Sequence, residues 1–220
     1  MITEKDTIKC EAIFNDEHTH RFLWKRVWDK DKPMATVVML NPCHADNVIT
    51  DTTTALVVNN VARLEMYGGV NIVNLYSVLT AKLNFRWNSD EDLNDPENDN
   101  YIKKAAEESD IVILAWGKGA DSNQRITERA VDVINLLNHL EDKLYIISDG
   151  LRKGLHPLTP TIRNGWTLEP AKIRKDIREK GDKEEGNASD FVVVGECMEN
   201  KEDDISGDTS VNNEEESVPA

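Results

Sequence analysis

The chain has 220 residues, which is enough for one sizeable α/β domain and an additional segment. Its formal net charge of −15 is concentrated at one end, because residues 181–220 hold 13 Asp and Glu against 2 Lys and Arg, a net of −11 that leaves −4 for residues 1–180. This balance argues against broad nonspecific binding to nucleic acid or to an anionic membrane, and it leaves a local basic groove open.

Three cysteines, Cys10, Cys43 and Cys197, are widely spaced and form no C-x-x-C pair, so neither a disulfide framework nor a thiolate zinc site is indicated. The N-terminal residues lack the basic region and apolar core of a secretory signal. No apolar run approaches the roughly 20 residues of a membrane helix. We therefore expect a soluble, cytoplasmic protein with no membrane partner.

Residues 7–14 and 20–28 are β-prone and flank the polar segment NDEHT, which predicts an N-terminal β-hairpin. Strict alternation puts Arg21, Leu23, Lys25 and Val27 on one face of the second strand and Phe22, Trp24, Arg26 and Trp28 on the other. Two interpretations stay open. The hairpin covers a sheet edge with its aromatic residues, or Arg21, Lys25 and Arg26 form a phosphate-binding stripe.

Strands and helices then alternate along the chain. The apolar run at 35–40 predicts a buried parallel strand, and 52–67 predicts a helix that begins at Asp51 or a following Thr and ends at Gly68-Gly69. Further predicted strands are 70–75, 110–116 and 144–148, with a last edge strand at 166–168. Two further helices are predicted: one is capped by Asn98 or Asp99 and runs to about 108, and the other starts at Ser122 or Asn123 and runs to about 140.

This alternation predicts a three-layer α/β/α domain over residues 1–170, with a mostly parallel four-stranded central sheet. The polar, turn-rich stretch 80–100 predicts a long loop of the kind that often covers a site. Residues 171–220 are Lys/Glu-rich and then acidic, which predicts a largely disordered tail. Within the tail, the apolar island at 191–194 predicts either a docking motif for a partner or a strand that folds back.

Polar residues or a glycine follow the four predicted core strands: Asn41, Asn74, Gly117 and Asp149, the last leading to His156. The carboxyl ends of parallel strands share one sheet edge, where ligands bind in open α/β folds. An Asn amide offers a donor and an acceptor to the edge of a nucleobase. A histidine can donate to a developing oxyanion or act as an acid or base near neutral pH. Purely structural roles in the loops stay open for each residue.

The loop after the first core strand adds Pro42, Cys43, His44, Asp46 and Asp51 as candidate binding residues. Adjacent residues rarely face each other, so a Cys43–His44 catalytic pair is disfavoured. Neither His44 with the two aspartates nor the histidines at 18 and 20 have the spacing of metal ligands, so no metal is predicted.

Three further candidates come from the other strand ends. Tyr76 follows the second core strand, and Arg152 and Lys153 precede His156. The two cations bind a phosphate group or are simply solvated, and the sequence leaves both interpretations open. Gly117-Lys118-Gly119 lacks the G-x-x-x-x-G-K-[ST] pattern of a phosphate loop, and no cofactor is expected.

Several short segments occur in an order that resembles one known family. They are RFLWKRVW at 21–28, MLNP at 39–42, GGVNIVNLYS at 68–77, Asn98-Asp99, AWG at 115–117 and Lys153-Gly-x-His-Pro-Leu158. Together they are similar to the bacterial and phage family known as domain of unknown function 1643, over about residues 20–160. This chain has Cys43-His44 where that family tends to have Ser-Thr. The family label itself implies no activity.

A more distant similarity is to the uracil-DNA glycosylases and their relatives. Those proteins have Asp-Pro or Asn-Pro near the end of the first core strand, an Asn after the second and a His-Pro-Ser-Pro-like loop after the fourth. Asn41-Pro42, Asn74 and His156-Pro-Leu-Thr-Pro160 occur here in that order. The resemblance implies that Asn41 positions the attacking water, Asn74 reads the base edge and His156 stabilises charge on the leaving base. An Asn at 41 cannot act as a general base.

These observations predict a protein that recognises a nucleobase, a nucleotide or DNA at the strand ends. Asn41 and His156 are its candidate catalytic residues if it hydrolyses an N-glycosidic bond. Two alternatives stay open. One is a non-catalytic module that sequesters a nucleotide or modified base, and the other is a DNA-mimicking or regulatory protein that binds a protein partner through its acidic tail.

Overall fold

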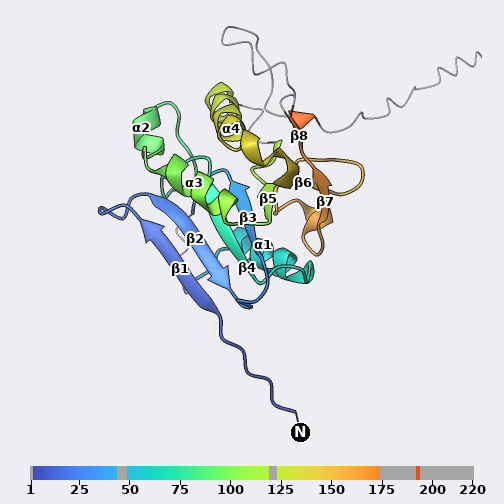
Figure 1. Cartoon of the computed structure of the whole chain (residues 1–220). Helices are drawn as coiled ribbons and strands as arrows, with labels where there is room; N and C mark the ends of the chain where they lie inside the picture. The colour runs from blue at the N-terminus through green and yellow to red at the C-terminus, as the bar shows by residue number, and fades with distance from the viewer. Residues whose placement is uncertain (1, 44–48, 119–122, 174–191, 194–220) are drawn as a thin grey trace, which may run out of the picture.

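The computed structural model describes residues 2–43, 49–118, 123–173 and 192–193, with a seven-stranded sheet at its centre (Figure 1). Hydrogen bonds join the strands in the order β1-β2-β4-β3-β5-β6-β7. The strands are β1 (Lys9–Phe14), β2 (Arg21–Val27), β3 (Met34–Met39), β4 (Gly69–Asn74), β5 (Ile111–Leu114), β6 (Leu144–Ser148) and β7 (Thr167–Pro170). The mixed α/β class expected from the sequence is confirmed.

The four middle strands, β4, β3, β5 and β6, run parallel. The expectation of a four-stranded sheet is wrong, because the sheet continues on both sides of them. The hairpin joins through β2, which pairs antiparallel with β4, and β7 pairs antiparallel with β6. These outer strands satisfy the N–H and C=O groups that β4 and β6 would otherwise leave unpaired at their edges.

Helices lie on both faces of the sheet (Figure 1). Helix α1 (Thr52–Arg63) packs Val57 and Val61 onto one face, which we call the α1 face. Helices α3 (Asn98–Glu107) and α4 (Gln124–Leu136) pack onto the opposite face, the α3/α4 face. The parallel strands are apolar on both sides for this reason, with alternate residues entering the two cores.

The order of the parallel strands places a topological switch point between β3 and β5. The chain leaves β3 through α1 towards β4, and it leaves β5 through α4, on the opposite face, towards β6. At such a point the two connections diverge, and in doubly wound sheets the resulting crevice holds the ligand. The carboxyl edge of the sheet is therefore the place to examine for function.

The helix ends agree with the sequence in part. Asp51 caps α1 by accepting from the Thr54 amide at 3.0 Å, and Asn123 caps α4. The prediction that Asn98 or Asp99 caps α3 is wrong, because the cap is Glu97 without a side-chain hydrogen bond. Both residues lie inside the first turn of α3, so their side chains are available for other contacts.

The remaining helical elements are short. Helix α2 (Asp90–Leu93) begins with a Ser89 capping box inside the segment expected to be loop. The 3-10 helices η2 (Asn138–Lys143) and η3 (Pro160–Ile162) lie between α4 and β7. Among the described residues, no helix combines the length and apolar character needed to cross a bilayer.

Beyond β7, a separate two-stranded sheet pairs β8 (Lys172–Ile173) with β9 (Val192–Val193). The apolar island at 191–194 thus contributes a strand, which agrees with one of its two interpretations. The rest of the predicted tail lies outside the described residues, so its disorder stays a prediction.

A β-bulge in β2 overturns the expected alternation of its side chains. The register with β1 shifts where Ile13 pairs with Leu23 and Phe14 pairs with Arg21, so Phe22 is the extra residue. Phe22 stacks on Tyr101 of α3, and Leu23 packs into the same α3/α4 core. Arg21 is therefore on the α1 face, together with Trp24, and not on the face predicted from strict alternation.

Candidate functional site

Backbone hydrogen bonds align the ends of the three central strands. The amide of Tyr76, after β4, donates to the carbonyl of Leu40, after β3, at 3.0 Å. The amide of Ala115, after β5, donates to β3 at 2.8 Å. Adjacent strands lie about 4.8 Å apart, so the ends of β4 and β5 stand roughly 10 Å apart across β3.

Asn74 is the last residue of β4 and is only 2% exposed. Ile72 lies in the core under α1 and Val73 in the core under α3 and α4, so alternation directs the Asn74 side chain to the α1 face. Its backbone carbonyl accepts from Asn98, whereas its side-chain amide has no hydrogen-bond partner among the described residues. A nearly buried amide with a free donor and acceptor is suited to reading a ligand edge.

Asn41 connects the end of β3 to the 80–100 segment. Its Nδ2 donates to the carbonyl of Thr80 at 2.7 Å and to that of Pro42 at 3.3 Å. The Thr80 amide donates back to the Pro42 carbonyl at 3.1 Å. The side-chain nitrogen of Asn41 thus satisfies backbone carbonyls of the loops, which is the structural role left open in the sequence analysis. Its Oδ1 has no partner within the described part of the chain and can accept a hydrogen from water.

Gly117 and His156 are brought together by the fold. Gly117 has a φ of +75°, and a Cβ on it would lie 2.7 Å from the Cβ of His156 and 3.2 Å from its backbone nitrogen. Glycine is needed here both for the left-handed backbone and for the close approach. The end of β5 therefore lies directly against the loop that follows β6.

The His156 ring is held in one tautomer. Its Nδ1 accepts from the amide of Leu158 at 3.1 Å, which assigns the proton of the neutral ring to Nε2. Burial lowers the pKa of His156 below the ordinary histidine value. At neutral pH the ring is therefore an uncharged hydrogen-bond donor, and Nε2 has no partner among the residues that the structure describes.

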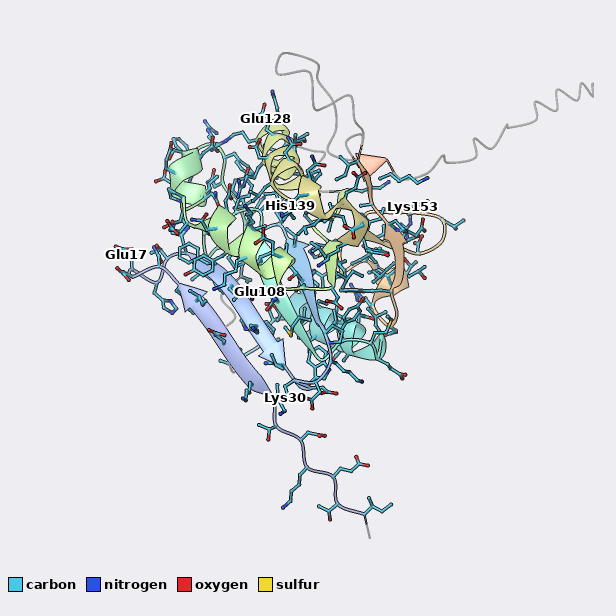
Figure 2. The ribbon with its side chains drawn as sticks, viewed as in Figure 1. Glu17, Lys30, Glu108, Glu128, His139 and Lys153 are labelled. Carbon is cyan, nitrogen blue, oxygen red and sulfur yellow. The ribbon has the colours of Figure 1, made fainter. Side chains whose placement is uncertain are left out.

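The cations beside His156 are paired with carboxylates. Arg152 donates from Nη2 and Nε to Asp149 Oδ2 at 2.7 and 3.1 Å, and its hydrogen bonds hold the pKa of Asp149 well below the usual range. Lys153 Nζ lies 2.7 Å from Glu169 Oε2 on β7, at the side of the sheet where Figure 2 labels it. An anionic ligand would compete with both pairs, and phosphate binding by Arg152 and Lys153 stays a prediction.

Arg21 lies near the start of α1, close enough to Asp51 and Cys43 for both to raise its pKa. Burial has the larger, opposite effect and lowers the pKa of Arg21 to about 10, so the guanidinium stays charged at neutral pH. Cys43 is an exposed free thiol. His44 and Asp46 lie outside the described residues, and their predicted binding roles are untested.

Tyr76 lies on the α3/α4 face, away from the Asn74 side chain. Its hydroxyl donates to the carbonyl of Arg125 at 2.9 Å, and its ring meets Phe85 edge to face at 5.7 Å. Burial raises the pKa of Tyr76 to about 12. The hydroxyl of Tyr76 thus hydrogen-bonds to α4, and its ring helps to hold the 80–100 segment through Phe85. A role of Tyr76 in substrate binding stays a prediction.

Arg125, in the first turn of α4, holds the same segment from the other side. Its Nη1 donates to the carbonyls of Phe85 and Asn88 at 2.9 and 3.1 Å, and its Nε donates to Asp90 at 3.0 Å. The 80–100 segment is thus fixed at Thr80 by Asn41 and at 85–90 by Arg125.

The fold therefore brings Asn41, Asn74, Gly117 and His156 to one sheet edge, with Cys43 and Asp51 near Arg21. Sequence reasoning missed the contribution of two residues behind this edge, Asn98 and Arg129, which contact the end of β4. Asn98 carries a signal, since it lies in a segment shared with a family, but its residue type predicts a helix cap equally well. Arg129 carried no signal, because its contact is with a distant backbone carbonyl.

A cavity of about 550 Å³ lies elsewhere, beside η2 and β8. It is lined by Asn138, His139, Glu141, Asp142, Ala171, Lys172 and Ile173. The register of β6 with β7 places these residues at the amino end of β6, the edge opposite Asn74 and His156. Within the described ranges, no three His, Cys, Asp or Glu side chains gather as metal ligands would.

Comparisons with known proteins give one family. No curated protein matches the chain. Among solved structures, the hetero-hexameric glutamate dehydrogenase from Thermus thermophilus (Leu-bound form) is 12% identical, with a TM-score of 0.27 over 62% of this chain and 31% of that one. A likeness this weak carries no argument. The sequence model of one family matches residues 21–158, well over half of the 220 residues, and the chain belongs to that family, described as protein of unknown function DUF1643.

Proposed function

We propose that this chain recognises a nucleobase or a nucleotide at the carboxyl edge of its parallel strands, in the manner of the uracil-DNA glycosylases that its motifs resemble. One observation carries the proposal: a nearly buried amide at Asn74, without a hydrogen-bond partner in the described part of the chain, and a neutral Nε2 donor at His156 lie on opposite sides of β3. The switch point of the sheet between β3 and β5 supports the same location.

The two side chains are complementary to a base that has an amide or imide edge. The amide of Asn74 donates to a ring carbonyl oxygen and accepts from a ring N–H, as paired donor and acceptor groups do in base recognition. The Nε2–H of His156 donates to a second carbonyl oxygen. A uracil-like pyrimidine has two carbonyl oxygens and a ring N–H in this arrangement. The Asn74 amide and the neutral His156 ring can hydrogen-bond to them without a change in protonation at neutral pH.

The same groups support hydrolysis of an N-glycosidic bond. A water oxygen would bond to the anomeric carbon of the sugar as the carbon–nitrogen bond breaks, and the bonding pair would leave with the base. The Nε2–H of His156 would stabilise the resulting negative charge, and the Oδ1 of Asn41 would orient the water. The water's proton passes finally to the departing base. Asn41 cannot remove this proton itself, so we expect slow turnover.

The test is a thermal-shift screen of the full chain with free bases, nucleosides, nucleotides and short single strands that contain uracil or modified bases. A ligand at 100 times its Kd stabilises the folded state by about 2.7 kcal/mol. Asn74→Ala and His156→Ala should each reduce the shift of any hit. Asn71→Ala is the matched control, because Asn71 lies in β4 but hydrogen-bonds Thr36 and Ser109 on the α3/α4 side.

A screen without hits would refute nucleobase recognition and favour a protein partner, for which deletion of residues 181–220 tests the acidic tail. A hit followed by product analysis separates an enzyme from a sequestering module. In an enzyme, His156→Ala lowers the rate more than the affinity, whereas in a binding module it lowers affinity alone.

A further inference from the structure

Two side chains from different helices hold the end of β4 from the α3/α4 face. Asn98, fully buried in the first turn of α3, donates from Nδ2 to the carbonyl of Asn74 at 3.0 Å. Arg129 of α4 donates from Nε to the carbonyl of Leu75 at 2.8 Å. We call Asn98 and Arg129 the carbonyl clamp.

Both members of the carbonyl clamp are themselves fixed. Arg129 forms a two-point ion pair with Asp99, donating from Nη1 to Oδ2 at 3.2 Å and from Nη2 to Oδ1. Asn98 also donates to Oδ1 of Asn94 at 2.7 Å. Because planar, two-point pairs hold a guanidinium in one orientation, the donor that reaches Leu75 has little freedom to turn.

The clamp completes the fixation of the backbone on which Asn74 sits. The amide of Leu75 already donates to Met39 of β3 at 2.9 Å, and the amide of Tyr76 donates to Leu40, just after β3, at 3.0 Å. With the two carbonyls held as well, the peptide planes on the C-terminal side of Asn74 cannot rotate without breaking hydrogen bonds. The direction in which the Asn74 side chain leaves the backbone is therefore fixed from behind.

The placement of Asn98 at the start of α3 is not the one that stability alone would favour. The Oδ1 of Asn98 is buried and has no hydrogen-bond partner among the described residues, a defect that costs about 1–3 kcal/mol. An Asn one position earlier would have capped α3, for a gain of about 1 kcal/mol, but that position holds Glu97 without a capping hydrogen bond. Local costs that the fold does not require tend to occur at functional sites.

We propose that Asn98 and Arg129 are positioning residues, which orient the Asn74 amide for recognition of a base. The inference rests on the proposed function, yet its geometric part can be measured without any ligand. Neither residue touches the base, because both lie on the α3/α4 face and the Asn74 amide is on the α1 face.

The decisive comparison is between Arg129→Gln and Arg125→Gln in the full chain. The two arginines lie one turn apart on α4, and each pairs with an aspartate and holds distant carbonyls. Arg125, however, holds the 85–90 segment instead of β4. Both variants lose similar contacts, so a general loss of stability should affect both alike.

Amide hydrogen exchange and the side-chain amide signals of Asn74, followed by NMR without ligand, give the first readout. Arg129→Gln should speed exchange at Leu75 and Tyr76 by about tenfold or more and shift or broaden the Asn74 side-chain signals, whereas Arg125→Gln should leave them within about twofold. Asn98→Ala should resemble Arg129→Gln, and Arg129→Lys, which keeps a donor, should restore part of the protection. Equal exchange in the two glutamine variants would overturn the proposal.

Binding of uridine, thymidine and a uracil-containing single strand gives the second readout. Arg129→Gln should weaken binding about tenfold, and Arg125→Gln by less than about twofold. Equal affinities in the two variants would overturn the positioning role even if the wild-type chain binds. A wild-type chain that binds none of these probes would refute the proposed function, and the exchange comparison would still decide whether the clamp fixes β4.

Discussion

Gly117 lies so close to His156 that a methyl group on the glycine would come within 2.7 Å of the histidine Cβ. This contact joins the end of β5 to the loop after β6, and it sets the distance of the imidazole from the strand ends. The loop is braced independently, since Asp149 accepts hydrogen bonds from both Arg152 and Thr161. The position of His156 therefore depends on a glycine and on a charged loop.

Replacing Gly117 with Ala should destabilise the fold and displace His156. The left-handed backbone alone costs a residue with a Cβ about 1–2 kcal/mol, and overpacking against His156 adds about 1–3 kcal/mol. Urea unfolding measures the sum. Gly154→Ala is the control, because Gly154 has a φ of +63° but no atom within 4 Å of its added methyl group. Equal losses in the two variants would contradict the close contact.

Unfolding should depend on the protonation of His156. In the folded chain burial lowers the pKa of His156, whereas in the unfolded chain it returns to about 6.5. As the pH falls through that ordinary value, the unfolded state binds a proton first, so the free energy of unfolding decreases until the folded pKa is reached. Urea midpoints from about pH 8 to about pH 5 measure the slope. His156→Asn should flatten it, and an unchanged slope would contradict the buried neutral ring.

The charge and the cap of Asp51 can be separated. Asp51→Ala removes the hydrogen bonds to Thr54, a lost N-cap that costs about 1 kcal/mol, and it removes the carboxylate as well. Asp51→Asn keeps an effective cap but removes the carboxylate that raises the pKa of the buried Arg21, so it should also destabilise the chain. Asn123→Asp, at the start of α4, is the matched swap and should be nearly neutral. Thermal unfolding compares the three, and a neutral Asp51→Asn would show that Arg21 does not depend on Asp51.

The 80–100 segment should loosen when its anchor is removed. Arg125→Ala loses hydrogen bonds to the Phe85 and Asn88 carbonyls and the ion pair with Asp90. Limited proteolysis should then cut faster between 85 and 93, while β4 remains protected. Cleavage at the wild-type rate would mean that the packing of Phe85 against Tyr76 suffices to hold the segment.

Much of the fold was predictable from local pattern. The runs at 35–40, 70–75 and 144–148 are apolar because both faces of the parallel strands are covered, and the strands lie there within one residue. The size of the sheet was not predictable, because the pairing of Trp24 with Ile72 joins segments far apart in sequence and leaves no periodic signal.

The candidate site was predictable where one residue type follows a strand end. The placement of Asn41, Asn74 and His156 at one sheet edge follows from topology, and their roles in a site stay a prediction. Their hydrogen bonds were not predictable: whether the Asn41 nitrogen is occupied depends on Thr80, and the tautomer of His156 depends on the Leu158 amide. The α3 cap was not predictable because Asn98 suits either a helix cap or a buried contact, and the carbonyl at the end of β4 determines which it makes.

The bulge in β2 limits where the length of the hairpin can change. Phe22 and Leu23 both face the α3/α4 core, so the side chains before and after this pair do not alternate between the two faces as they would in a regular strand. Deletion of Phe22 would restore an even phase and leave Arg21 on the α1 face, but it would remove the ring that stacks on Tyr101. Regular pairing without a deletion would instead carry the guanidinium of Arg21 across the sheet, away from Asp51. A shortened turn at 15–19 would have no such effect on phase. Length variation in this hairpin should therefore be confined to its turn.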